Sequence, residues 1–104
     1  MDDTVVAPLE LAETRAARRR GLLGRDGIVG ALLLRPARSV HTIGMRFPID
    51  VAHLDDDMVV LSVVTMSPWR IGRSRRHARQ VLEAEVGSMQ RWGIVPGVQI
   101  AVVG

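Results

Sequence analysis

The sequence predicts a mostly-β fold, α+β at the margin. We expect a compact sandwich- or jelly-roll-like domain of about six strands with one or two short helices. Short apolar runs rich in Val, Ile and Leu recur along the chain, separated by Gly, Pro, Asp or Arg, and helix signals are confined to two short segments. A length of 104 residues without an internal repeat or a low-complexity linker predicts a single domain over residues 1–104.

Most of the predicted strands are short apolar runs that end at turn-forming residues. Two of them flank the tripeptide Asp55-Asp56-Asp57, which predicts a hairpin even though the usual glycine is missing. Pro8 argues for an edge position or a break in the first strand. The strands predicted in this way cover residues 4–11, 28–34, 48–55, 58–66 and 98–103.

The sixth predicted strand covers residues 79–87, where apolar and polar side chains alternate. Leu82, Ala84 and Val86 would lie on one face, and Val81, Glu83 and Glu85 on the other. Helix is the rival interpretation because Leu, Glu and Ala are good helix formers. Gly87 ends the run too early for a stable helix, so the sequence favours a half-buried strand.

The helix signals are specific at their starts and weak in length. Thr14 is a suitable N-cap for a helix over residues 15–23 that Gly24 would end. Residues 88–94 predict one further turn of helix, closed by Gly93, and Pro96-Gly97 predicts a turn after it. A helix of fewer than three turns is marginal alone, so the first one must dock on the sheet.

Composition excludes several classes of protein. The chain has no cysteine, which rules out disulfides, zinc–thiolate sites and thiol nucleophiles. The acidic start lacks the features of a signal peptide, and the longest near-apolar run, residues 58–66, is far shorter than a membrane helix. We therefore expect a soluble cytoplasmic protein without membrane contact.

Metal, cofactor and nucleophile motifs are weak or absent. The Asp tripeptide lacks the Gly and Glu that an EF-hand loop needs at its sixth and twelfth positions. A facial metal site from His41, His53 and Asp50 stays open, although no familiar ligand spacing supports it. No G-x-S-x-G elbow, phosphate-binding loop or dinucleotide fingerprint is present. The sequence therefore predicts neither a cofactor nor a metal.

The segment HTIGMRFPID, residues 41–50, supplies the main candidate site. Strand alternation places Asp50 on one face with Ala52 and Leu54, close to the sheet interior, where an ionised carboxylate needs hydrogen bonds or a cation. Arg25 and His41 are candidate partners, so the three residues could line a small polar pocket. In the alternative, Asp50 has a structural role and either accepts hydrogen bonds from backbone amides near Pro48 or ties down the loop of Arg25.

Two clusters of arginine suggest a different activity. The first contains Arg15, Arg18, Arg19, Arg20 and Arg25, and the second contains Arg70, Arg73, Arg75, Arg76 and Arg79. All fourteen basic residues are Arg, and no acidic residue lies between Asp57 and Glu83. Arg73, Arg75 and Arg76 could pair with phosphates while Trp69 stacks on a base. Against this, arginine-rich loops are usually just solvated, and no nucleic-acid-binding motif is present.

The order of motifs resembles domain of unknown function family 192. The matching features are Arg18-x-x-Gly21-Leu22-Leu23-Gly24-Arg25, HTIGMRFPIDVAHLD, VLEAEVG, and the Gly93-Ile94 and Pro96-Gly97 pairs. Many members of that family carry Met-Lys-Asn-Thr before the Pro-Leu-Asp segment, where this chain has Thr42-Ile43-Gly44-Met45. The resemblance implies a compact, mostly-β fold and no established activity.

Three functions remain open on the sequence. The first is a non-catalytic domain that binds a small ligand or a protein partner at a polar pocket near Asp50. The second is a hydrolase-like enzyme that uses His41 and Asp50 as an acid–base pair. The third is nucleic-acid association through the arginine clusters.

Overall fold

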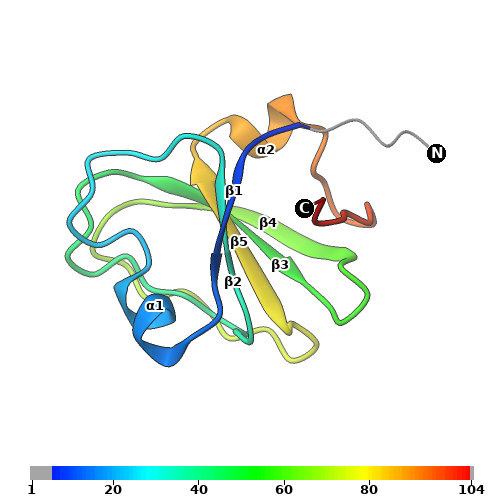
Figure 1. Ribbon diagram of the computed structural model, residues 1–104, viewed down its shortest axis with the longest axis horizontal. Coiled ribbons are helices and arrows are strands. Elements are labelled where there is room, and N and C mark those ends of the chain that lie inside the picture. Colours follow the sequence, from blue (N-terminus) through cyan, green and yellow to red (C-terminus); the bar gives the residue numbers. More distant parts are fainter. Residues whose placement is uncertain (1–5, 104) are drawn as a thin grey trace.

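The computed structural model describes residues 6–103, which form five strands and two short helices (Figure 1). The predicted mostly-β class is confirmed. In chain order the elements are β1 (Leu9–Ala12), α1 (Arg15–Arg20), β2 (Ala31–Leu34), β3 (Ile49–Leu54), β4 (Val60–Met66), β5 (Gln80–Glu85) and α2 (Ser88–Arg91).

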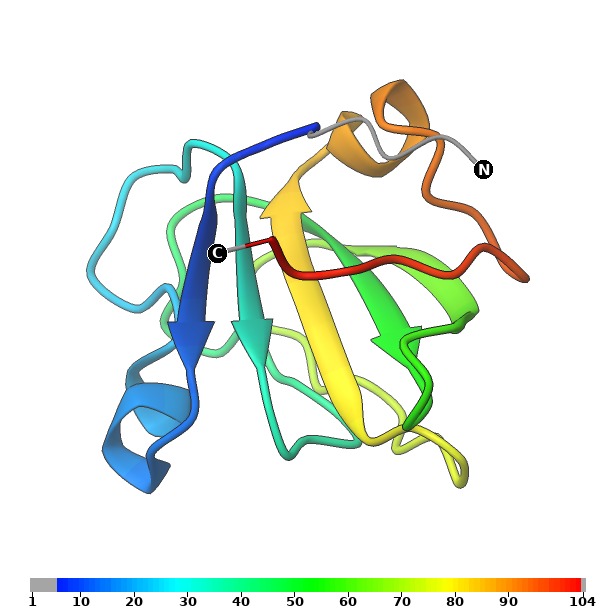
Figure 2. The same ribbon diagram turned by 45° about the vertical axis from the view of Figure 1, so that its right-hand side comes forward.

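All five strands belong to one mixed sheet in the order β1-β2-β5-β3-β4, which can be followed across Figure 2. The β1–β2 pair is parallel and the other pairs are antiparallel. The edge position of β1 agrees with Pro8, which lies just before it. The helices and loops supply the covering layers that a second sheet would supply in a sandwich.

The predicted hairpin is confirmed as the β3–β4 pair. Its turn is stabilised by Asp55, whose Oδ1 accepts hydrogen bonds from the amides of Asp57, at 2.9 Å, and Val59, at 3.0 Å. Met58 adopts the left-handed φ of 65° that a glycine would ordinarily supply. In this turn the side chain of Asp55 therefore serves as the hydrogen-bond acceptor for two backbone amides, those of Asp57 and Val59.

The interior of the sheet explains why β3 and β5 are buried on both faces. Alternate residues of these strands enter two apolar clusters, one on each side of the sheet. One cluster includes Val51 and Val81 and is covered by the segments between α1 and β3. The other includes Ala52 and Leu82 and is covered by α2 and the C-terminal segment. The faces predicted from alternation in residues 48–54 and 79–87 are thus correct, but the half-buried strand expected at residues 79–87 is wrong, because β5 is central in the sheet and covered on both faces.

Both helices are shorter than the predicted ones. Thr14 caps α1 as expected, its Oγ1 accepting a hydrogen bond from the amide of Ala17 at 3.0 Å. The helix ends at Gly21 rather than Gly24, because Gly21 leaves the helical region with φ 46° and directs Leu22 into the core. No helix within residues 6–103 has the length and apolar character needed to cross a membrane.

The sixth strand is the main difference from the sequence prediction. Residues 98–103 make one isolated β-bridge, between Val59 and Gln99, instead of a strand. Their segment crosses one face of the sheet (Figure 2), where Ile100 packs against the apolar cluster. Within residues 6–103, backbone hydrogen bonds join this segment to the sheet only at the start of β4, from the amide of Val60 to the carbonyl of Val98 at 2.8 Å and from the amide of Ile100 to the carbonyl of Met58 at 3.0 Å. In the first predicted strand, residues 4 and 5 lie outside the described residues.

Candidate ligand-binding pocket

Asp50 is buried, and protein groups occupy both of its carboxylate oxygens. Oδ1 accepts a hydrogen bond from the hydroxyl of Thr65 at 2.7 Å, and Oδ2 accepts one from the amide of Gly87 at 2.8 Å. Gly87 is the N-cap of α2 and has a left-handed φ of 90°. Asp50 therefore ties the turn between β5 and α2 to β3. This is a structural role, but its partners are Thr65 and Gly87 instead of the predicted amides near Pro48 or the loop of Arg25.

Arg25 and His41 lie elsewhere. Arg25 forms a bidentate pair with Glu10 on β1, at 2.7 and 2.9 Å. His41 is exposed, and its Nδ1 accepts a hydrogen bond from the amide of Ile43 at 3.3 Å. The structure does not bring these two residues together with Asp50. Asp50 shares its sheet face with Ala52 and Leu54, whereas His41 borders a cavity on the opposite face.

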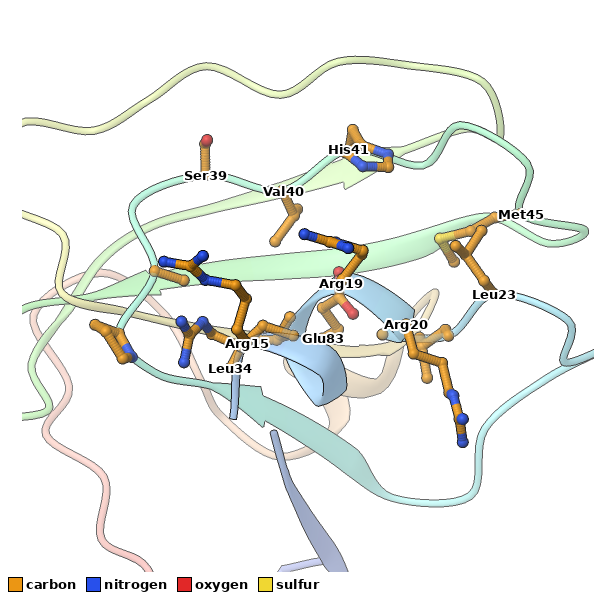
Figure 3. Close-up of a pocket in the computed structure, with 15 residues that line it drawn as sticks. Arg15, Arg19, Arg20, Leu23, Leu34, Ser39, Val40, His41, Met45 and Glu83 are labelled. Carbon is orange, nitrogen blue, oxygen red and sulfur yellow. The ribbon is translucent and has the colours of Figure 1, made fainter. Parts of the chain in front are cut away.

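That cavity has a volume of about 320 Å³ and lies between α1 and the segment of residues 36–41 (Figure 3). Such a volume is in the range of small-ligand sites. Its apolar wall includes Leu22, Leu34, Val40 and Met45. Its polar lining comes from the arginines of α1, from Ser39 and His41, and from Glu83.

Glu83 is the most unusual side chain in this cavity. It lies on β5 between Leu32 and Val51 of the flanking strands, and only 3% of it is exposed. Within residues 6–103 no hydrogen bond or ion pair reaches its carboxyl group. Burial raises the pKa of Glu83 from 4.5 to about 7, because the charged form loses its hydration.

The backbone of Gly21 passes directly over this carboxyl group. A Cβ atom built on Gly21 would lie 3.9 Å from Oε1 of Glu83, which is ordinary van der Waals contact. The left-handed φ of Gly21 is what allows α1 to end here and turn over the strand. The GLLG motif therefore builds one wall of the cavity.

Four arginines of α1 form the cationic part of the lining: Arg15, Arg18, Arg19 and Arg20. Arg18 is tied to the backbone, since its guanidinium donates to the carbonyl of Glu13 at 2.7 Å. Arg19 extends toward Val40 and His41, whereas Arg20 extends away from them (Figure 3). An anionic group entering the cavity would thus meet guanidinium groups on the α1 side.

The residues predicted for nucleic-acid binding have different surroundings. Arg73 and Arg76 are exposed, but Arg75 is half-buried, and its Nε has no hydrogen-bond partner within residues 6–103. Arg75 lies near His53, a buried histidine whose Nδ1 is 3.1 Å from the hydroxyl of Ser62. Burial lowers the pKa of His53, and the positive charge of Arg75 lowers it further.

The facial metal site that the sequence left open has no cluster of ligands in the described part of the chain. Within residues 6–103 no three His, Asp or Glu side chains lie together in a way that could hold a metal ion. His41, His53 and Asp50 are separated because alternation puts Asp50 and His53 on opposite faces of β3.

Sequence reasoning missed Glu83 as a candidate site residue. The alternating pattern placed it correctly beside Val81, but nothing in residues 79–87 indicates that this face is covered. The signal available was indirect: β5 is the central strand, and a chain that leaves the arginine-rich helix at Gly21 must pack somewhere. The structure places Gly21 and Leu22, directly after α1, over Glu83.

The fold and the cavity together define the class of protein. It is a small mostly-β domain with a cavity on one face of its sheet, and a buried carboxyl group lines that cavity. The family model of DUF192, described as an uncharacterized ACR, matches residues 1–102. The chain therefore belongs to the DUF192 family, as its motifs indicated.

Curated relatives are named only as UPF0127 proteins. One from Pyrococcus abyssi is 30% identical over 84 residues, covering 76% of this chain and 72% of the relative. Another, from Thermococcus gammatolerans, is 33% identical over 95 residues, covering 86% of this chain and 62% of the relative. This chain thus spans less than two thirds of the Thermococcus protein.

Two solved structures share the fold. A protein of unknown function from Novosphingobium aromaticivorans has a TM-score of 0.80 at 22% identity, covering 90% of this chain and 74% of that one. A putative transcription regulator from Sinorhizobium meliloti has a TM-score of 0.75 at 21% identity, covering 86% and 76%. At these identities the similarity shows the fold alone.

Proposed function

We propose that this chain is a non-catalytic binding domain whose ligand is a small organic anion with an apolar body, held in the cavity between α1 and β5. The observation that carries the proposal is the buried carboxyl of Glu83, without a protein partner in residues 6–103, at a cavity lined by α1 arginines. Of the three residues predicted from the sequence, the proposed site keeps His41. Glu83 and the arginines of α1 take the place of Asp50 and Arg25.

The charge of the lining selects the class of ligand. Guanidinium groups favour carboxylates and phosphates, and a cationic ligand would be repelled by the arginines of α1. Leu22, Leu34 and Met45 give an apolar wall that favours a hydrocarbon body. In its protonated form Glu83 donates a hydrogen bond instead of repelling the anion.

A binding role is favoured over the acid–base pair of His41 and Asp50. That pair would need both side chains at one cavity, whereas Asp50 is held by Thr65 and Gly87 on the other face of the sheet. His41 at the cavity border is free to contact a ligand but has no carboxylate bonded to it within residues 6–103.

The experiment is an NMR titration of backbone amides with four probes: hexanoate, phenyl phosphate, hexan-1-ol and hexylamine. We expect the two anions to shift amides of Gly21, Leu22 and Met45, and the amine to leave them unchanged. Their affinity should fall as the pH rises through about 7, since the pKa of Glu83 is raised to that value and its ionised form repels anions.

Matched variants locate the effect. Replacing Arg15 and Arg19 together by Gln should weaken anion binding about tenfold or more, because the charge-assisted hydrogen bonds between these two guanidinium groups and the anion are lost. Arg91→Gln, on α2 at the other face, should leave it unchanged. Tighter binding of hexylamine than of hexanoate, or no shift near Gly21 with any probe, would refute the proposal.

A further inference from the structure

The fold brings the two arginine clusters of the sequence against one segment. The cavity places the α1 arginines beside residues 36–41. On the other side of that segment, Gly72 donates its amide to the carbonyl of Val40 at 2.9 Å, and Arg75 donates to that of Arg38 at 3.1 Å. Figure 3 shows Ser39, Val40 and His41 between α1 and the chain that carries these later residues.

Within residues 6–103, several arginines near this segment form no ion pair with an acidic side chain. Arg38, Arg70, Arg73 and Arg76 are all exposed. The ion pairs found within residues 6–103 involve other arginines, namely Arg25, Arg35, Arg46 and Arg79. Backbone hydrogen bonds and the bridge between His41 and Ile71 pair the two segments that carry these arginines. We call the exposed residues of the paired segments the arginine face: Arg38, Trp69, Arg70, Arg73 and Arg76.

Trp69 gives this face an aromatic platform. Its side chain is 65% exposed, and its backbone has a left-handed φ of 65°, which is uncommon for a bulky residue. Thr42, which is fully buried, fixes this backbone. The carbonyl of Thr42 accepts from the Trp69 amide at 2.9 Å, and its Oγ1 accepts from the Arg70 amide at 2.8 Å. The indole is therefore held out from an anchored loop.

We propose that the arginine face binds single-stranded nucleic acid, with the arginines on successive phosphates and Trp69 stacked on a base. An exposed indole on the same paired segments as exposed arginines, which form no ion pair within residues 6–103, matches the requirements of single-strand binding. A duplex is disfavoured as the ligand, because it keeps its bases stacked internally. In residues 6–103 the longer helix has only six residues, too few to read a major groove.

This surface is separate from the ligand pocket. Arg73, Arg76 and Trp69 do not line the cavity between α1 and β5. Their substitution leaves Glu83 and the α1 arginines in place, so failure of one proposal does not imply failure of the other.

The experiment measures fluorescence anisotropy of labelled oligo(dT) and oligo(U), each of about 12 nucleotides, a length suited to a small single-strand site. With about four phosphate contacts, affinity should fall about 50-fold between roughly 50 and 200 mM salt. The DNA and RNA arms identify which backbone is preferred. Binding of neither oligonucleotide at low salt would overturn the proposal.

Two pairs of variants separate charge and stacking. Arg73→Gln with Arg76→Gln should lower both the affinity and its salt dependence, whereas Arg46→Gln with Arg91→Gln removes the same charge elsewhere and should not. Trp69→Ala should weaken oligonucleotide binding about tenfold, and Trp69→Phe should largely preserve it. Both substitutions keep a Cβ atom, so neither one changes much how readily residue 69 adopts its left-handed φ of 65°.

Inorganic polyphosphate of matched charge and duplex DNA of matched length complete the test. Polyphosphate has no bases, so Trp69→Ala should not change its binding. Duplex should bind more weakly than the single strand. If duplex binds more tightly, or if Trp69→Ala leaves oligonucleotide affinity unchanged, single-strand recognition is wrong.

Discussion

Two buried carboxyl groups on neighbouring strands have opposite surroundings. Asp50 on β3 receives hydrogen bonds from Thr65 and Gly87, whereas Glu83 on β5 receives none from residues 6–103. A buried carboxylate with donors on both oxygens stabilises the fold, while one without them is costly to ionise. The difference assigns Asp50 to architecture and leaves Glu83 available to the cavity.

At this scale we predict the effect of Asp50→Asn. The amide retains one acceptor oxygen but presents an NH₂ group to one of two donors. We therefore expect a loss of about 1–3 kcal/mol in the free energy of unfolding, measured by urea denaturation. Thr65→Val removes only the hydroxyl partner and should cost less. An Asp50→Asn protein as stable as the wild type would contradict the structural role.

Single residues also show how far the sequence could lead. The placement of Asp50 beside Ala52 and Leu54 followed from strand alternation and is correct. Its true partners were out of reach, because Gly87 and Thr65 are 37 and 15 residues away and meet it only through the pairing of β3 with β4 and the start of α2. Glu83 was missed for a similar reason: its burial depends on the segment of Gly21 and Leu22, about 60 residues earlier in the chain, packing over β5.

At the scale of elements, the parallel β1–β2 pair depends on a close backbone approach. Gly30 has φ 78°, and a Cβ atom there would clash with the carbonyl oxygen of Pro8. The same oxygen accepts the hydrogen bond from the amide of Ala31 that begins the pairing, at 3.0 Å. Only glycine satisfies both the dihedral angle and the contact at this position.

Gly30→Ala should therefore lower the free energy of unfolding by at least about 2 kcal/mol, through strain and through displacement of β1. Gly27→Ala, in the same loop, is the matched control. A Cβ atom on Gly27 meets nothing within 4 Å among the described residues, so that change should be neutral. Urea denaturation of both variants checks the difference, and equal stabilities would show that Pro8 moves freely.

Elements also set the limits of prediction from sequence. Strand existence followed well from apolar runs and alternation, and Thr14 correctly predicted where α1 begins. The end of α1 was wrong because two glycines, Gly21 and Gly24, compete as the stop, and only the burial of Leu22 decides between them. Residues 98–103 have strand composition, but Ile100 packs on the sheet face instead.

At the scale of the whole molecule, one sheet separates two differently used faces. The face toward α2 and the C-terminal segment is mostly apolar, and its buried polar side chains Asp50 and Gln80 are both hydrogen-bonded. The face toward α1 contains the cavity with Glu83. The fold buries this carboxyl group without a compensating donor from residues 6–103.

The stability of the whole chain against pH tests that claim. The pKa of Glu83 is raised by burial to about 7 in the folded chain, from 4.5. Between these values the unfolded chain releases the proton while the folded chain keeps it, so stability falls as the pH rises. The stabilisation is fully present below pH 4.5 and is lost through about pH 7, for a total of about 3 kcal/mol.

The most direct measurement is urea denaturation of the wild type and Glu83→Gln from pH 4.5 to pH 8, with Glu85→Gln, an exposed carboxyl on the same strand face, as control. Glutamine imitates the protonated carboxyl at every pH. We predict that Glu83→Gln gains about 3 kcal/mol relative to the wild type between those limits, while Glu85→Gln gains little. A difference between Glu83→Gln and wild type that stays constant with pH would contradict the account.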